Sequence, residues 1–153
     1  MVTISNLVDC PQHLPQVASW IFNEWGNLIQ GLTLNAVEAK LQTHLNLDSI
    51  PLTLVASFDG MPVGTASLVY QDMSSRPDLT PWLASVYVAF EYRNQRIGSR
   101  LVKAAEETAK GLRIRQLYLF TPDKERFYTW LGWSVIDTTE YRNQQVVIMT
   151  KML

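Results

Sequence analysis

A short basic turn with a single glycine stands between an apolar run and an amphipathic one, and its residue types suit anion binding. The turn reads RNQRIGS, Arg93–Ser99, and follows the strand-like run LASVYVAF. After it, Gly98 to Leu112 repeats apolar residues at helical spacing. The first N–H groups of a helix lack an intrahelical partner, and the helix dipole is positive there. Strand, turn and helix in this order therefore predict an anion site that suits a pyrophosphate.

The charged side chains around this turn support the same prediction. Arg93, Arg96 and Arg100 are basic, and the helix carries no acidic residue before Glu106. The nucleotide-binding patterns GxxxxGK[ST] and GxGxxG are both absent. The alternative is a basic turn whose arginines are only solvated, and composition alone does not separate the two interpretations.

The elements around the turn predict a mixed α/β domain. Asp59-Gly60 signals a two-residue hairpin, and Asn35 followed by Glu38 has the form of an N-cap pair. A hairpin followed by a strand–helix–strand crossover implies a sheet that is antiparallel at one end and parallel in the middle. The turn would then lie at the carboxyl ends of two parallel strands, where ligands of such sheets bind. Helices are predicted at Leu14–Trp25, Ala36–Leu47, Gly98–Leu112 and Asp123–Leu131, strands at Thr3–Leu7, Leu52–Phe58, Pro62–Tyr70, Trp82–Val88, Gln116–Phe120, Trp133–Thr139 and Gln145–Met152, and a surface loop at Gln71–Pro81.

Length and composition bound the class of protein. The 153 residues predict one domain over the whole chain, and a net charge of −1 argues against nucleic acid or an anionic membrane as the main partner. Cys10 is the only cysteine, which excludes an intramolecular disulfide and fits a reducing compartment. No targeting or membrane-spanning segment stands out, so a cytoplasmic protein is expected. His13 and His44 are predicted to lie at the surface or beside helices, and no ligand spacing suggests a metal.

Two motifs carry a resemblance to a known family. SVYVAFEYRNQRIGSRL resembles the acetyl-coenzyme A binding motif of the GCN5-related N-acetyltransferase (GNAT) family, which reads Arg or Gln, two residues, Gly, one residue, then Gly or Ala. Arg93 matches the first position and Gly98 the last, and FYTWLGW is similar to the family's second signature, FYxxLGW. Arg96 stands where the family usually has glycine, and Phe90 where a proline is common. The first departure matters if the turn requires a positive φ at position 96, because such a φ disfavours a side chain.

The resemblance implies the fold and the activity. The implied fold is of the α/β (α+β) class, with a mixed sheet of about seven strands, mainly antiparallel with a central parallel pair splayed at the cofactor site, flanked by about four helices. The implied activity is transfer of an acetyl group from acetyl-coenzyme A to a primary amine of a small molecule or a peptide or protein N-terminus, by direct attack on the thioester and without a metal. A homodimer is common in such a family, although no stretch of this sequence identifies an interface.

The resemblance also assigns roles to residues. Tyr128 stands where the family places the tyrosine that protonates the departing thiolate, and the backbone N–H of Val88 is the implied oxyanion donor. Phe127 would pack in the core or form a wall for the cofactor. The main chain of Val86, Tyr87 and Val88 would run beside the pantetheine arm, and Arg93, Asn94, Gln95, Arg96, Ile97, Gly98 and Ser99 would hold the pyrophosphate.

The acceptor side is less determined by sequence. Glu24 is the first candidate for a general base, with Glu91, Asp72 or a water relay as alternatives. Trp20, Trp25 and Trp82 fall on segments that could face the acceptor, where an aromatic ring favours a flat or cationic group. Two other functions stay open: a non-catalytic module that keeps the fold and senses an acyl-coenzyme A, and a protein-interaction domain with no cofactor.

Overall fold

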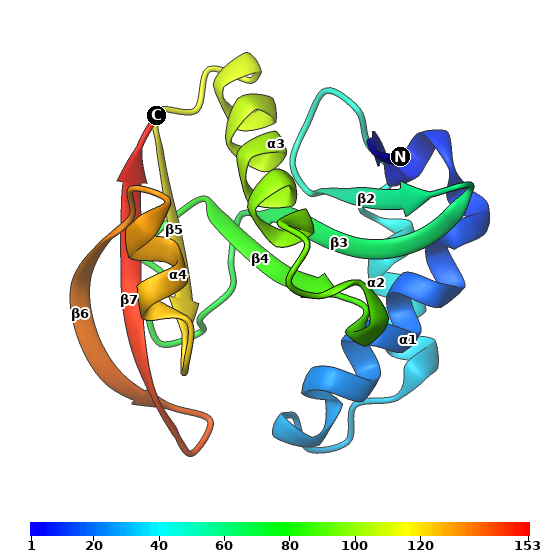
Figure 1. Cartoon of the computed structure of the whole chain (residues 1–153). Coiled ribbons are helices and arrows are strands. Elements are labelled where there is room, and N and C mark those ends of the chain that lie inside the picture. The colour runs from blue at the N-terminus through cyan, green and yellow to red at the C-terminus, as the bar shows by residue number, and fades with distance from the viewer.

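A single sheet with helices on both faces makes up the computed structural model, which describes all residues from Met1 to Leu153 (Figure 1). The strands are β1 (Val2–Asn6), β2 (Leu52–Phe58), β3 (Met61–Val69), β4 (Trp82–Val88), β5 (Gln116–Thr121), β6 (Ser134–Tyr141) and β7 (Gln144–Met152), and the α-helices are α1 (Leu14–Trp25), α2 (Leu34–Gln42), α3 (Ile97–Gly111) and α4 (Glu125–Trp130). The seven strands lie in the order β1-β2-β3-β4-β5-β7-β6. Only β4 and β5 are parallel, so the predicted mixed sheet is confirmed.

The parallel pair opens soon after it begins. The only residues of β4 and β5 that pair are Trp82 and Tyr118, at the start of β4. Further along β4, Ser85 has a φ of 54°, and the pairing with β3 shifts register there. Such a bulge bends a strand and increases its twist. The sheet therefore splits between the carboxyl ends of β4 and β5, as the resemblance implied.

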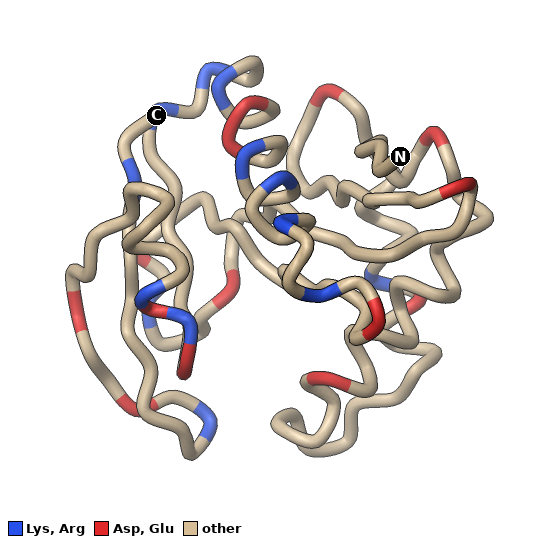
Figure 2. The backbone as a smooth tube through the Cα atoms, viewed as in Figure 1, with Lys and Arg blue, Asp and Glu red and all other residues tan.

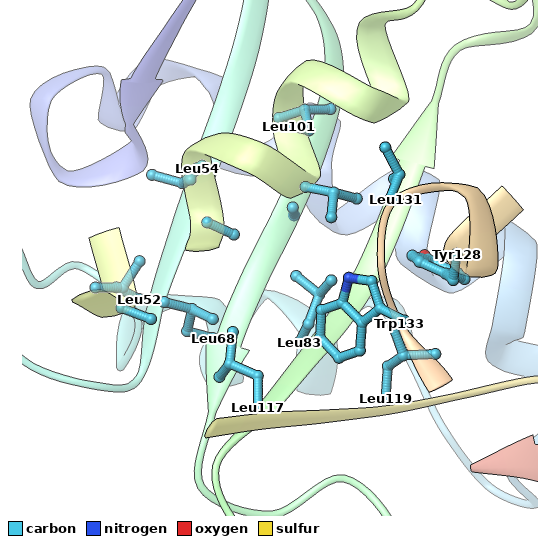
Figure 3. Close-up of a cluster of buried hydrophobic side chains, with 14 of the residues drawn as sticks. Leu52, Leu54, Leu68, Leu83, Leu101, Leu117, Leu119, Tyr128, Leu131 and Trp133 are labelled. Carbon is cyan, nitrogen blue, oxygen red and sulfur yellow. The ribbon is translucent and has the colours of Figure 1, made fainter. Parts of the chain in front are cut away.

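Two apolar clusters attach the helices to opposite faces of the sheet. The larger cluster joins α3 and the end of α4 to the strands; Figure 3 shows Trp133 beside Leu83, with Leu101 above them and Leu117 below. The smaller one joins α1 and α2 to β2 through Val17, Leu41 and Val55. This arrangement follows from alternation, because neighbouring strand residues such as Leu54 and Val55 point to opposite faces.

The segment between β3 and β4 is more than a surface loop, which corrects the sequence-based prediction. Met73 is fully buried and Leu79 is 8% exposed, and both pack in a third cluster with Trp82. Trp82 Nε1 donates to the carbonyl of Leu79 at 2.7 Å, and Arg76 pairs with Asp137 of β6 at 2.9 Å. The segment thus crosses the sheet and covers β5 and β7, because two apolar residues among its polar ones anchor it.

Local signals were mostly confirmed, with one error. The β2–β3 turn has φ of 50° at Asp59 and 81° at Gly60, as an Asp-Gly hairpin requires. The prediction for the second helix is wrong at both ends, because Thr33 rather than Asn35 is its N-cap and accepts a hydrogen bond from Ala36 N at 3.1 Å. None of the helices combines the length and the apolar character that a bilayer span needs.

Candidate active site

A cleft of about 1210 Å³ occupies the opening between β4 and β5. It is lined from both faces of the sheet, so we name its two ends. The α3 end is formed by Arg93, Asn94, Arg96–Ser99, Phe127 and Tyr128, and the α2 end by Glu24, Trp25, Lys40, His44, Asp72 and Arg142. A separate depression of about 310 Å³ lies beside Ile50 and Tyr70 and contains no predicted site residue.

The turn before α3 has the backbone of an anion-binding loop. Asn94 and Arg96 are both left-handed, with φ of 64° and 65°. Main-chain N–H groups in such alternating conformations converge on one point and bind anions. Arg96 is also the N-cap of α3. The N–H groups of Ile97, Gly98 and Ser99 have no intrahelical partner at this helix start, and the Arg96 side chain makes no capping hydrogen bond to them. The positive φ that the motif requires at position 96 is therefore present, with an arginine in place of glycine.

Gly98 gives the turn its clearance. A Cβ atom at this position would lie 3.5 Å from Phe127 Cζ and 3.8 Å from Val88 Cγ2, which is ordinary contact distance. A methyl group would fit there and a larger side chain would meet α4 and β4. This position therefore accepts glycine or alanine, in agreement with the pattern.

The three arginines near the turn have different surroundings. Arg93 Nε donates to the carbonyl of Val88 at 2.9 Å, and its guanidinium lies over the Tyr87 ring at 5.3 Å. Arg100 donates to the carbonyl of Val2 at 2.9 Å and does not line the cleft. Arg96 has no partner for its guanidinium and lines the cleft, as every turn residue except Gln95 does. Positive charge at the start of α3 is visible in Figure 2.

The carboxyl end of β4 presents main-chain groups to the opening. Ser85, Val86, Tyr87 and Val88 all line the cleft. Ala89 N donates to the carbonyl of Val63 in β3 at 2.8 Å, and strand donors alternate in direction. The N–H group of Val88 therefore points away from β3 and into the opening, beside the carbonyl that Arg93 engages.

Tyr128 faces the same opening from α4. The residue is 7% exposed and packs edge-on against Phe127 at 4.9 Å and Trp133 at 6.1 Å between ring centres. Figure 3 shows Tyr128 near Trp133. Its side chain lines the cleft, so its hydroxyl oxygen is not left buried without a hydrogen-bond partner. Burial and then the charge of Asp123 raise the pKa of Tyr128 well above its ordinary value. The phenol is thus held as a proton donor at neutral pH.

The predicted acceptor residues separate in the structure. Glu24 is exposed and lines the cleft, as does the half-buried Trp25, whose ring meets Tyr87 edge-on at 6.4 Å. Trp20 packs on Tyr87 at 5.5 Å but does not line the cleft. Trp82 is fully buried in the third cluster, so its expected place beside an acceptor is wrong: its ring fills the core under the β3–β4 segment.

Among the candidate bases, Asp72 is the one whose pKa is clearly shifted by its surroundings. It lines the α2 end, whereas Glu91 is exposed and lies outside the cleft. Burial raises the pKa of Asp72 to about 6, and the nearby charges of Lys40 and Arg142 oppose the rise only in part. A carboxylate with this pKa is ionised at neutral pH and is a stronger base than an exposed one.

Comparison with known proteins identifies the family. The model of the acetyltransferase (GNAT) family matches residues 15–133. The chain belongs to the GNAT acetyltransferase family. No curated protein gives a significant match.

Solved structures agree with this GNAT fold. A GNAT-family acetyltransferase from Streptococcus pneumoniae is similar over 100% of both chains, with 18% identity and a TM-score of 0.74. An aminoglycoside 6'-N-acetyltransferase in complex with coenzyme A is similar over 98% of this chain and 96% of its own, with 16% identity and a TM-score of 0.75. N-acetylglutamate synthase from Neisseria gonorrhoeae, in complex with coenzyme A and N-acetyl-glutamate, is similar over 100% of this chain and 35% of its own, with 16% identity and a TM-score of 0.70. At these identities the likeness establishes the fold.

The GNAT cleft also holds a buried polar network that the sequence did not indicate. His44 is 6% exposed, and its Nδ1 atom lies 2.9 Å from Thr53 Oγ1, which lies 2.8 Å from Ser67 Oγ. Burial, assisted by the charge of Lys40, lowers the pKa of His44 to about 4, so the ring is neutral at neutral pH. Of the two positions predicted for His44, the one beside a helix is correct, because His44 follows the C-cap of α2, and the surface position is wrong, because the chain turns back toward the sheet there. The sequence feature that could have indicated a buried polar partner is the pair of hydroxyl side chains, Thr53 and Ser67, inside otherwise apolar strands.

Proposed function

We propose that this GNAT protein is an acetyl-coenzyme A dependent N-acetyltransferase that acetylates a primary amine. The observation that carries the proposal is one cleft with two facing features: the left-handed turn at the start of α3 and the protonated phenol of Tyr128 on α4. Two similar structures hold coenzyme A, and both are named as enzymes that form N-acetyl products. The shared fold, together with the left-handed turn of this chain, supports acetyl-coenzyme A as the cosubstrate here.

The turn residues fit a pyrophosphate. The unpartnered N–H groups of Ile97, Gly98 and Ser99 would donate to phosphate oxygens, and the free guanidinium of Arg96 would add charge. The open edge of β4 at Val86 and Val88 would hydrogen-bond the pantetheine arm in the manner of an added strand. The cleft leads from this edge to the α2 end, where the amine would enter.

The residues between the two ends suit direct acetyl transfer. The amine nitrogen would attack the thioester carbon, so that a C–N bond forms, the C–S bond breaks and the amine loses a proton. The Val88 N–H group would stabilise the charge on the carbonyl oxygen, and Tyr128 would protonate the sulfur. We assign the role of base to Asp72 rather than Glu24, because Asp72 is half-buried where Glu24 is exposed, and because the pKa of Asp72 is raised.

The second candidate function is a sensor that binds acyl-coenzyme A without turnover. Arg96 favours it, because a non-glycine residue with a φ of 65° brings a side chain to the site where the pyrophosphate would lie. Tyr128 argues against it, since a sensor has no need of a proton donor in the cleft.

Calorimetry and turnover together test the proposal. Acetyl-coenzyme A is titrated into the wild type and into Arg96→Gly, and release of the free thiol is then followed with a panel of amines. We expect the wild type to bind and to release thiol with at least one amine. Binding without turnover of any amine would replace the enzyme with the sensor, and absence of binding by both proteins would remove both functions.

A further inference from the structure

The α2 end of the cleft contains two cations that form no salt bridge in the protein. Lys40 on α2 and Arg142 at the tip of the β6–β7 hairpin both line the cleft. The ion pairs of the chain involve only Arg76, Lys110 and Lys151 among its basic residues. Figure 2 shows the positive charge at the hairpin tip, across from the helices of the other face. Both cations are therefore available to a ligand.

Two carboxylates lie at the same end. Glu24 and Asp72 line the cleft there, and Asp72 lies near enough to Lys40 and Arg142 for both charges to act on it. The α2 end thus presents both positive and negative groups around one space. A polycationic acceptor would meet Lys40 and Arg142 as repulsive neighbours, whereas a molecule with one ammonium and one acidic group matches both signs.

The hairpin that carries Arg142 is attached to the segment that carries Asp72. Ser74 N donates to the hydroxyl of Tyr141 at 3.3 Å, and the Arg142 guanidinium lies 4.8 Å from the centre of the Tyr141 ring. The hydrogen bond links the segment of Asp72 to the hairpin, and the ring contact positions Arg142 on that hairpin. The positions of Asp72 and Arg142 relative to each other are therefore fixed by a contact between their two segments.

We infer that the acceptor is an amine that also carries a carboxylate or another acidic group, with Lys40 and Arg142 holding the acidic group while Asp72 faces the amine. The inference rests on the proposed N-acetyltransferase function and narrows its substrate class. An α-amino acid is the simplest member of the class. The apolar side chains of Trp25 and Ile29 also line this part of the cleft and would contact the remainder of the molecule.

Matched acceptor pairs test this inference. Thiol release from acetyl-coenzyme A is measured with the common amino acids, with the carboxamide of each and with the corresponding decarboxylated amine. We expect at least one acid to exceed its carboxamide in kcat/KM by about tenfold or more, the size of a lost hydrogen bond to a charged group. Lys40→Gln and Arg142→Gln should each raise KM for the acid and reduce its advantage, while kcat changes less.

Lys103→Gln is the control, because Lys103 is exposed on α3 and lies outside the cleft. If carboxamides or plain amines are used as well as the acids, or if both cleft variants behave like the control, the inference fails and the N-acetyltransferase function stands. If no member of any pair is acetylated but another amine of the panel is, the inference fails and the N-acetyltransferase function stands; if acetyl-coenzyme A binds and no amine at all is acetylated, both fail.

Discussion

Arg93 donates its Nε hydrogen to the carbonyl oxygen of Val88 at 2.9 Å, which ties the turn before α3 to the last residue of β4. The same guanidinium lies over the rings of Tyr87 and Phe90, at 5.3 and 5.7 Å. The Arg93 side chain therefore links the two parts of the proposed cofactor site, the turn and the open strand edge.

Replacing this side chain should loosen the cofactor site without unfolding the protein. In Arg93→Lys the planar guanidinium is lost, and an ammonium cannot reproduce both the hydrogen bond and the stacking. We expect the Kd for acetyl-coenzyme A, measured by calorimetry, to rise about tenfold. Arg126→Lys, an exposed change outside the cleft, is the matched control, and equal affinities for the two variants would contradict the role given to Arg93.

Two substitutions of the left-handed Arg96 distinguish the effect of backbone strain from the effect of the side-chain charge. A left-handed residue other than glycine costs roughly 1–2 kcal/mol, so we expect Arg96→Gly to be more stable than Arg96→Ala by about 1 kcal/mol in urea unfolding. Both variants lose the guanidinium. If that group contacts a phosphate, both should bind acetyl-coenzyme A more weakly than the wild type; tighter binding by Arg96→Gly would show instead that the side chain crowds the site.

Tyr128 should contribute to the reaction and not to binding. Tyr128→Phe keeps the ring contacts with Phe127 and Trp133 and removes the proton donor, so we expect kcat to fall by about 10²-fold or more with little change in Kd. Because the pKa of Tyr128 is raised, its ionisation should leave the activity unaffected up to about pH 10. Tyr70→Phe, an exposed change outside this cleft, is the control, and a similar kcat for the two variants would exclude acid catalysis by Tyr128.

Asp72 should set the acidic limb of the pH profile. Its base form is lost as the pH falls through its folded-state pKa of about 6, so kcat/KM should decline below that pH. Asp72→Asn should lower kcat/KM and remove this limb, whereas Glu24→Gln should keep it. A limb that persists in Asp72→Asn and disappears in Glu24→Gln would return the role of base to Glu24.

The same carboxylate has a measurable effect on stability. The folded state raises the pKa of Asp72, so it binds a proton more tightly than the unfolded chain does. The contribution of this group to stability is therefore greatest at low pH and falls as the pH rises from about 4 through 6. Asp72→Asn should be more stable than the wild type at pH 7, by thermal melting, and this difference should shrink toward pH 4.

An ion pair outside the cleft, between the buried Glu106 and the half-buried Lys151, should affect stability alone. Lys151 Nζ lies 2.7 Å from Glu106 Oε1 and also donates to the carbonyl of Leu131, and Trp133 Nε1 donates to Glu106 Oε2 at 3.1 Å. Lys151→Met would leave Glu106, 7% exposed, without its cation, and we expect a loss of about 3 kcal/mol in unfolding free energy. Lys110→Met removes an exposed pair 3.9 Å long and should cost less than about 1 kcal/mol. Equal losses in unfolding free energy would show that the burial of Glu106 does not increase the cost of removing its partner.

Elements that depend on neighbours in sequence were predictable. The Asp59-Gly60 hairpin, the helix Leu14–Trp25 and the strand Trp82–Val88 were all predicted with the bounds that the structure shows. The turn before α3 belongs to the same group, because turn chemistry, apolar periodicity and a motif all act over a few residues. The N-cap of α2 was the local exception: Thr33 and Asn35 are both capable caps, and the extended backbone at Thr33 decided between them.

The α2 end of the cleft came only from the tertiary structure. Lys40, Asp72 and Arg142 are far apart in the chain. They line one cleft because the β3–β4 segment crosses the sheet and is hydrogen-bonded to the β6–β7 hairpin. Burial of His44 and Trp82 was likewise invisible in their local sequence, since a side chain's exposure depends on what distant segments cover it. By itself the sequence determined the elements, the turn and the family motifs. The gathering of charges at the α2 end was decided by the packing of segments distant in the chain, because charges act through space.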